Sequence, residues 1–236
     1  MPSQARPRRA SGFNVAQLPL DLGHLSALGR DDFLVAPSNE AAVKWLERWP
    51  DWPRPALALH GPPGSGKTHL AHVFTTRARA AGVAAAFVEP ATLDIAMVPN
   101  RVGEARAVVV DDANRAPEQA LLHLYNLVAE RRGHLLIVAA EPPSRWPIAL
   151  ADLRSRLLAA PTAAVSAPDD ALLSAVLVKL FADRQVTIGA DVICYLVTRI
   201  ERSFAAARAA VAALDAAALA EKHAITAPFA RRVLKL

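Results

Sequence analysis

The stretch that decides the fold is ALALHGPPGSGKTHLAHVF, residues 56–74, in which an apolar run leads through a glycine-rich loop into a helical segment. The loop GPPGSGKT, residues 61–68, has the spacing of a phosphate-binding P-loop. Its glycines let the backbone curl so that successive N–H groups point at phosphate oxygens, at the positive end of the following helix. A plain turn from strand to helix would not need this full pattern, so the sequence predicts a nucleotide site.

Two side chains of the loop have predicted chemical roles. Lys67 can reach the β- and γ-phosphates, and the Thr68 hydroxyl can bind Mg²⁺. The expected nucleotide-binding residues of the loop are Gly61, Pro62, Pro63, Gly64, Ser65, Gly66, Lys67 and Thr68. ATP and ADP meet such a loop through the same phosphates, so the sequence leaves open which of the two is resident.

A second apolar run, AVVVDD at residues 107–112, ends in two carboxylates. Ligands of open parallel sheets bind beyond the carboxyl ends of the strands. We therefore expect Asp111 to bind Mg²⁺ together with Thr68, and Asp112 to orient the attacking water. An alternative stays open in which Asp112 only caps the next loop.

Around these motifs, apolar runs alternate with helical patterns. Five runs predict strands: 56–60, 84–89, 107–112, 134–140 and 162–167. Helical patterns cover 39–49, 67–81, 93–98 and 117–132, with a mixed segment at 150–158. This alternation predicts an α/β fold in which a five-stranded parallel sheet is flanked by helices.

Past Pro168 the strand signal ends. Four helices are predicted there, at 169–184, 190–200, 203–222 and 226–236. Asp169, Ser203 and Thr226 stand where N-cap residues are expected. The single cysteine, Cys194, lies in the apolar run DVICYLV and is expected to be a small core residue. The C-terminal part therefore reads as a small all-helical subdomain.

Composition narrows the class of protein. The chain has 236 residues, 53% of them hydrophobic and 21% charged, which is typical of a globular protein. No apolar run approaches the roughly 18 residues of a membrane span, and with one cysteine we expect a cytoplasmic protein. Arg6, Arg8 and Arg9 supply three of the five net positive charges, so the rest of the chain predicts no dedicated nucleic-acid face. Whether this arginine-rich head contacts DNA stays open.

QLPLDL, residues 17–22, is an apolar hexapeptide on a polar tail. It could be a first strand or a docking peptide. Because five strands are already predicted between residues 56 and 167, we favour the peptide. Its anchors would be Gln17, Leu18, Leu20 and Leu22.

Two groups of arginines suggest contacts with phosphates. In LADLRSRLLAA, residues 150–160, Arg154 and Arg156 do not share a helical face, so they serve different targets. One could be an arginine finger for a nucleotide held by a neighbouring subunit, and the alternative is surface salt bridges. Arg202 stands at a helix N-terminus, where its charge is unfavourable unless it meets a phosphate. Arg208, further along, is interpreted as solvated.

Together these motifs resemble the AAA+ module of the bacterial DnaA initiator family, over about residues 31–236. The resemblance implies an arginine finger at Arg156, a nucleotide-sensing arginine at Arg202, and a C-terminal lid. The segment DDFLVAPSNEAAV resembles the family's entry segment beside the adenine. The polar first sensor is absent or shifted, because HLLIVAAEPP has Ala140 followed by Glu141. We therefore expect weak ATP hydrolysis by the protein itself.

A DnaA-like module without the DNA-reading domain and with a QL-type peptide resembles the Hda branch, called HdaA in alphaproteobacteria. This resemblance implies a protein that docks on the DNA polymerase III β sliding clamp and promotes hydrolysis of DnaA-bound ATP. DNA contact would be indirect, through the clamp, and homo-oligomerisation stays open. Three segments are expected: a flexible tail with the clamp-binding peptide at 1–27, the nucleotide-binding domain at 28–167 and the lid at 168–236.

Three other functions are compatible with part of the sequence. A helicase loader of the same class would need a helicase- or DNA-binding extension, which the sequence does not show. A P-loop kinase for small molecules would carry its lid between strands rather than in a C-terminal helical segment. An adaptor that binds ADP without turnover is favoured by the absent or shifted first sensor.

Overall fold

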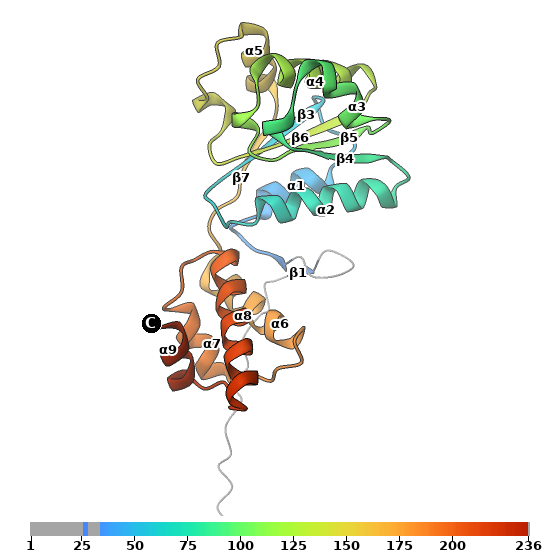
Figure 1. The fold of residues 1–236 in the computed structure, drawn as a ribbon. Helices are drawn as coiled ribbons and strands as arrows, with labels where there is room; N and C mark the ends of the chain where they lie inside the picture. The colour runs from blue at the N-terminus through green and yellow to red at the C-terminus, as the bar shows by residue number, and fades with distance from the viewer. Residues whose placement is uncertain (1–25, 28–33, 236) are drawn as a thin grey trace, which may run out of the picture.

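The computed structural model describes residues 26–27 and 34–235 as an α/β body followed by a helical lid (Figure 1). The body contains a five-stranded parallel sheet with the strand order β4-β5-β6-β3-β7. The strands are β3 (Ala56–His60), β4 (Ala85–Val88), β5 (Ala107–Val110), β6 (His134–Ala139) and β7 (Thr162–Ala164). The predicted sheet is therefore confirmed, and the P-loop strand β3 lies between β6 and β7.

Helices cover both faces of the sheet (Figure 1). On one face, α1 (Glu40–Glu47) and α2 (Lys67–Ala80) pack over Leu57 and Leu59 of β3. The other face carries α3 (Val98–Val102), α4 (Glu118–Glu130) and α5 (Ala151–Ala159). Successive strand residues point to opposite faces, so the nearly continuous apolar strands are buried on both sides, as parallel sheets require.

The lid has four helices around a core of its own. They are α6 (Asp170–Ala182), α7 (Ala190–Val197), α8 (Phe204–Glu221) and α9 (Ala227–Leu234). The three predicted N-caps are confirmed. Side-chain oxygens of Asp169, Ser203 and Thr226 accept backbone N–H hydrogen bonds at 2.8, 3.1 and 3.3 Å.

Some elements differ from expectation. The single helix predicted at 93–98 is a 3-10 turn, η2 (Ile95–Met97), followed by α3, whose first turn contains Pro99. Cys194 is exposed, because α7 turns Val192, Ile193 and Leu196 inward instead.

The remaining short elements connect the larger ones. They are the antiparallel pair β1 (Ser26–Ala27) and β2 (Leu34–Val35), and the 3-10 turns η1 (Pro90–Thr92), η3 (Ala113–Arg115) and η4 (Pro143–Arg145). In the part of the chain that the structure describes, no helix is long and apolar enough to cross a membrane. The predicted docking peptide at 17–22 and the arginine-rich head lie outside the described residues.

Candidate nucleotide site

The P-loop runs from the end of β3 to the start of α2, and its backbone conformation requires glycine. Gly61, Gly64 and Gly66 have φ values of 153°, 73° and 98°. A Cβ atom at Gly61 would lie 1.9 Å from the Val165 carbonyl oxygen. The loop therefore has a backbone conformation that larger residues could not adopt, and its role as a phosphate cradle stays a prediction.

Lys67 begins α2, and its ammonium lies inside the loop. Nζ donates hydrogen bonds to the carbonyl oxygens of Gly61 at 2.7 Å and Pro62 at 2.8 Å. Burial lowers the pKa of Lys67, against the opposing effect of the Asp111 and Asp112 carboxylates. An ammonium has three donors, so one N–H remains for a phosphate oxygen.

Ser65 provides a direct test of whether the loop fits a ligand. Its hydroxyl oxygen is buried and has no hydrogen-bond partner among the described residues. A buried polar group without a partner is costly. A phosphate oxygen in the cradle would supply that partner.

Thr68 and Asp111, predicted to share Mg²⁺, are brought together. The Thr68 hydroxyl donates to Asp111 Oδ2 at 2.6 Å. One hydroxyl and one carboxylate suit Mg²⁺, which completes its shell with waters and phosphate oxygens. Among the described residues, no group of three or more His, Cys, Asp or Glu side chains is placed so that it could hold a metal ion. When bound here, Mg²⁺ would neutralise phosphate charge.

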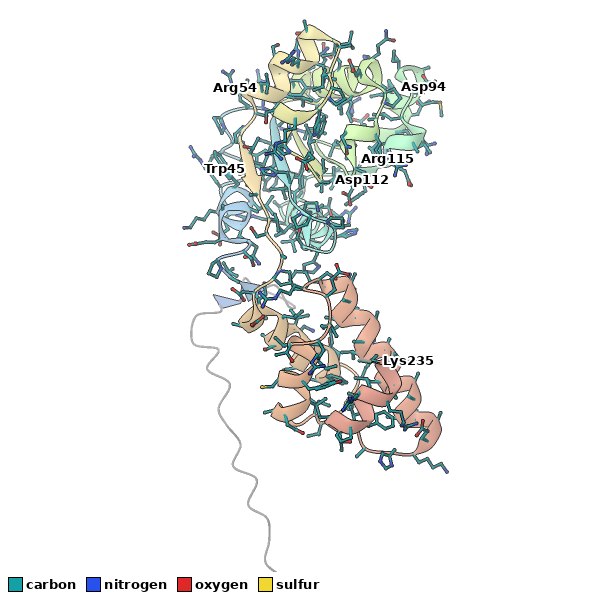
Figure 2. All side chains as sticks on the ribbon, turned by 90° about the vertical axis from the view of Figure 1, so that its left-hand side faces the viewer. Trp45, Arg54, Asp94, Asp112, Arg115 and Lys235 are labelled. Atoms are coloured by element: carbon teal, nitrogen blue, oxygen red, sulfur yellow. The ribbon has the colours of Figure 1, made fainter. Side chains whose placement is uncertain are left out.

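Asp112 follows Asp111 in the left-handed region, with φ of 50°, and its N–H donates to Asp111 Oδ1 at 3.0 Å. Its side chain is exposed and makes no capping hydrogen bond to η3. Figure 2 shows Asp112 at the edge of the body that is turned toward the lid. Its role in orienting water stays a prediction.

A cleft of about 350 Å³ lies between the P-loop and the lid. This volume is within the roughly 300–1,000 Å³ of small-molecule sites. The body lines the cleft with Leu34, Asn39, Gly64, Gly66, Lys67, Thr68 and His69, and the lid with Leu172, Val176, Lys179, Leu180, Asp183, Phe204, Ala205 and Arg208. One wall is therefore rich in phosphate-binding groups, and the other is largely apolar. A larger hollow of about 560 Å³ between α7 and α9 contains no P-loop residue and is not assigned to the nucleotide.

Of the arginines near the start of α8, the structure places Arg208 at the cleft and Arg202 outside it. Arg202 does not line the cleft, and its guanidinium pairs with Asp170 at 2.9 Å. Arg208 lines the cleft and has no ion-pair partner among the described residues. The Phe204 N–H donates to the Gly64 carbonyl at 3.0 Å, which sets α8 directly against the P-loop. No sequence pattern identifies Arg208, because its place at the cleft depends on this contact between α8 and the P-loop.

Arg156 lies apart from this cleft. It belongs to α5, at the end of the body farther from the lid (Figure 1). Its Nε and Nη2 donate to the two carboxylate oxygens of Asp152 at 3.1 and 3.2 Å. Its guanidinium carbon lies 5.5 Å from the centroid of the Tyr125 ring. The neighbouring Arg154 is exposed.

The tip of β6 is the place where the sequence predicts an absent or shifted first sensor. Ala140 follows the strand and contributes only its carbonyl, which accepts the Gly61 N–H at 3.1 Å. No polar side chain at this position can therefore reach the γ-phosphate.

Residues 170–234 match the family model "Hda, lid domain". The body and the lid together superpose on domain III of the Thermotoga maritima replication initiator DnaA with a TM-score of 0.74 and 16% identity, over 86% of this chain and 93% of that one. These findings confirm the resemblance to the Hda branch of the DnaA family and the AAA+ fold.

Two further comparisons agree. AMPPCP-bound DnaA from Aquifex aeolicus superposes with a TM-score of 0.65 and 15% identity, over 76% of this chain and 62% of that one. A protein of Haemophilus influenzae, described only as uncharacterized, is 28% identical over 195 residues, which cover 79% of this chain and 84% of that protein. The lid match and these superpositions show that the chain has a DnaA-like fold with a lid similar to that of Hda.

Proposed function

We propose that this protein binds adenine nucleotide with Mg²⁺, docks on the DNA polymerase III β sliding clamp, and promotes hydrolysis of ATP held by DnaA. The observation that carries the proposal is a lid that matches the Hda lid model, on a DnaA-like body whose arginine finger candidate, Arg156, does not line its own nucleotide cleft.

The nucleotide part rests on the cleft. The Lys67 ammonium, the buried Ser65 hydroxyl and the Thr68–Asp111 pair meet where the phosphates and Mg²⁺ of a nucleotide would lie. The similar DnaA of Aquifex aeolicus was solved with AMPPCP, an ATP analogue. Arg208, at the lid wall, is proposed as a further phosphate contact, and Arg202 keeps its predicted sensor role only if it leaves Asp170.

Arg156 would act on a nucleotide held by another protein. A guanidinium placed beside the γ-phosphate stabilises charge in the transition state, and such fingers raise rates by about 10³–10⁵. Arg156 does not line the cleft of its own chain. Action in trans on DnaA is consistent with this placement.

The clamp contact is proposed for Gln17, Leu18, Leu20 and Leu22 on the sequence pattern alone. A peptide that orders on binding loses conformational entropy, which apolar anchors must outweigh. Pro19 restricts the unbound peptide and so lowers that loss.

The decisive experiment measures turnover of DnaA-bound ATP with the purified protein, with and without clamp loaded on DNA. We expect stimulation that requires the clamp. Arg156→Ala should abolish stimulation and keep nucleotide binding, whereas the matched control Arg154→Ala, on the same helix, should retain most of it. Loss of nucleotide binding in Arg156→Ala would show that the arginine acts within its own chain.

The clamp contact has a separate test. Changing Leu20 and Leu22 to alanine should remove clamp binding in a pull-down, while Arg156→Ala should not affect it. Full clamp retention by the double variant would contradict the docking proposal and leave the nucleotide proposal intact.

A second candidate is an ADP-bound adaptor without turnover of its own, which Ala140 at the sensor position favours. It predicts that the protein alone hydrolyses no ATP in a single-turnover assay. Hydrolysis by the isolated protein, lost in Asp111→Asn, would exclude this candidate.

A further inference from the structure

The guanidinium of Arg156 is held on two sides by its own chain. One edge, formed by Nε and Nη2, is bound by both oxygens of Asp152 at 3.1 and 3.2 Å. One face lies over the Tyr125 ring of α4, 5.5 Å from its centroid. Helices α4 and α5 pack against each other, so both supports come from adjacent elements (Figure 1).

This arrangement leaves a defined part of the guanidinium available. Arginine has five N–H donors in a planar fork, and Asp152 accepts two of them. The other three, on Nη1 and Nη2, have no acceptor among the described residues. They form the edge that binds phosphate oxygens in a bidentate way.

The two supports differ in strength. The Arg156–Asp152 pair is solvent-exposed, with side-chain exposures of 35% and 57%, and exposed pairs contribute little. Tyr125 is only 5% exposed and belongs to the core beneath α4, so its ring cannot move with the arginine. Burial raises the pKa of Tyr125, with Arg156 opposing the shift, so the ring stays a neutral phenol at neutral pH.

We propose that Tyr125 is a positioning residue, whose buried ring is the platform that aims the free edge of Arg156 at a phosphate bound by a partner protein. The inference rests on the proposed finger role of Arg156. A preorganised side chain loses less freedom on docking, and a cation over a ring face is stabilised electrostatically. The platform therefore acts through Arg156 without touching the nucleotide.

The experiment compares Tyr125→Phe, which keeps the ring, with Tyr125→Leu, which removes it but keeps an apolar side chain. At saturating protein, Tyr125→Leu should lower stimulated hydrolysis of DnaA-bound ATP about threefold to tenfold, and Tyr125→Phe should match the wild type. The concentration for half-maximal stimulation should stay unchanged in both, because a misaimed finger affects the chemical step rather than docking.

The chain offers a matched control. Tyr195 of the lid lies under Arg199 at 5.6 Å, in the same kind of pair. Tyr195→Leu should leave stimulation at the wild-type level. Full stimulation by Tyr125→Leu, or an equal loss in Tyr125→Phe, would overturn the inference, and so would a loss that appears only as a higher half-maximal concentration.

A second readout does not depend on DnaA. The ¹⁵N relaxation of the Arg156 Nε–H group should show an ordered side chain in the wild type and Tyr125→Phe, and a mobile one in Tyr125→Leu. If the wild type does not stimulate DnaA at all, the proposed function fails. The relaxation measurement then still shows whether the Tyr125 ring orders Arg156. A mobile Arg156 in the wild type would overturn it.

Discussion

The P-loop and the lid wall face each other across one cleft, but they present functional groups in different ways. The P-loop uses backbone N–H groups and three glycines at positive φ, all within eight consecutive residues. The lid uses side chains that project from α6 and α8, such as Leu172 and Arg208. A consecutive motif fixes its own geometry, whereas a helix side chain depends on how its helix is rotated against the body.

The largest expected effect tests the P-loop backbone by comparing two glycines that both have positive φ, Gly61 and Gly82. Gly61→Ala should lower the free energy of unfolding by about 3 kcal/mol or more, because the new Cβ would meet the Val165 carbonyl at 1.9 Å. Gly82→Ala should cost about 1 kcal/mol, since nothing lies within 4 Å of its Cβ and only the left-handed conformation is strained. Denaturant unfolding measures both, and equal losses would contradict the contact-based account.

The next effect concerns binding. Lys67→Ala should weaken binding of a fluorescent ADP analogue about 10- to 100-fold, which corresponds to the loss of a charged hydrogen bond. The melting temperature without nucleotide should fall little, because Lys67 is a buried charge whose pKa burial already lowers. Wild-type affinity should also decline as pH rises through that lowered pKa. Unchanged affinity in the variant would remove the P-loop as the binding site.

The smallest effect tests the lid half. Arg208→Ala should weaken nucleotide binding about fivefold, as expected for an exposed cation near a phosphate. Arg202→Ala should change affinity less than about twofold, because its guanidinium is engaged by Asp170. Titration with the same fluorescent ADP analogue measures both variants. A larger loss of affinity in Arg202→Ala than in Arg208→Ala would support the phosphate contact that the sequence predicted for Arg202.

The sequence predicted correctly those features of the fold that depend on residues close together in the chain. The glycine conformations of the P-loop and the caps at Asp169 and Ser203 follow from short-range patterns, and the structure has them. The five apolar runs also predicted the parallel sheet. Each of these features is decided by neighbours within a few residues or by burial on both faces.

Features that depend on rotation or packing could not be obtained in this way. Cys194 has apolar neighbours in sequence, but the turn of α7 places it outward. Arg208 reaches the cleft only because α8 begins against Gly64. Tyr125 and Arg156 belong to α4 and α5, which are separated along the chain by β6, and no spacing in the sequence predicts their contact.

The hydrogen bond from the Phe204 N–H to the Gly64 carbonyl fixes the start of α8 to the P-loop, so a rotation of the helix about this contact would move its far end most. The helix has 18 residues, so its far end lies about 27 Å from that contact at 1.5 Å per residue. A rotation of α8 by about 10° about this contact would move the far end of the helix by about 5 Å. A small change in the backbone of the P-loop would therefore cause a displacement of several ångströms at the far end of α8.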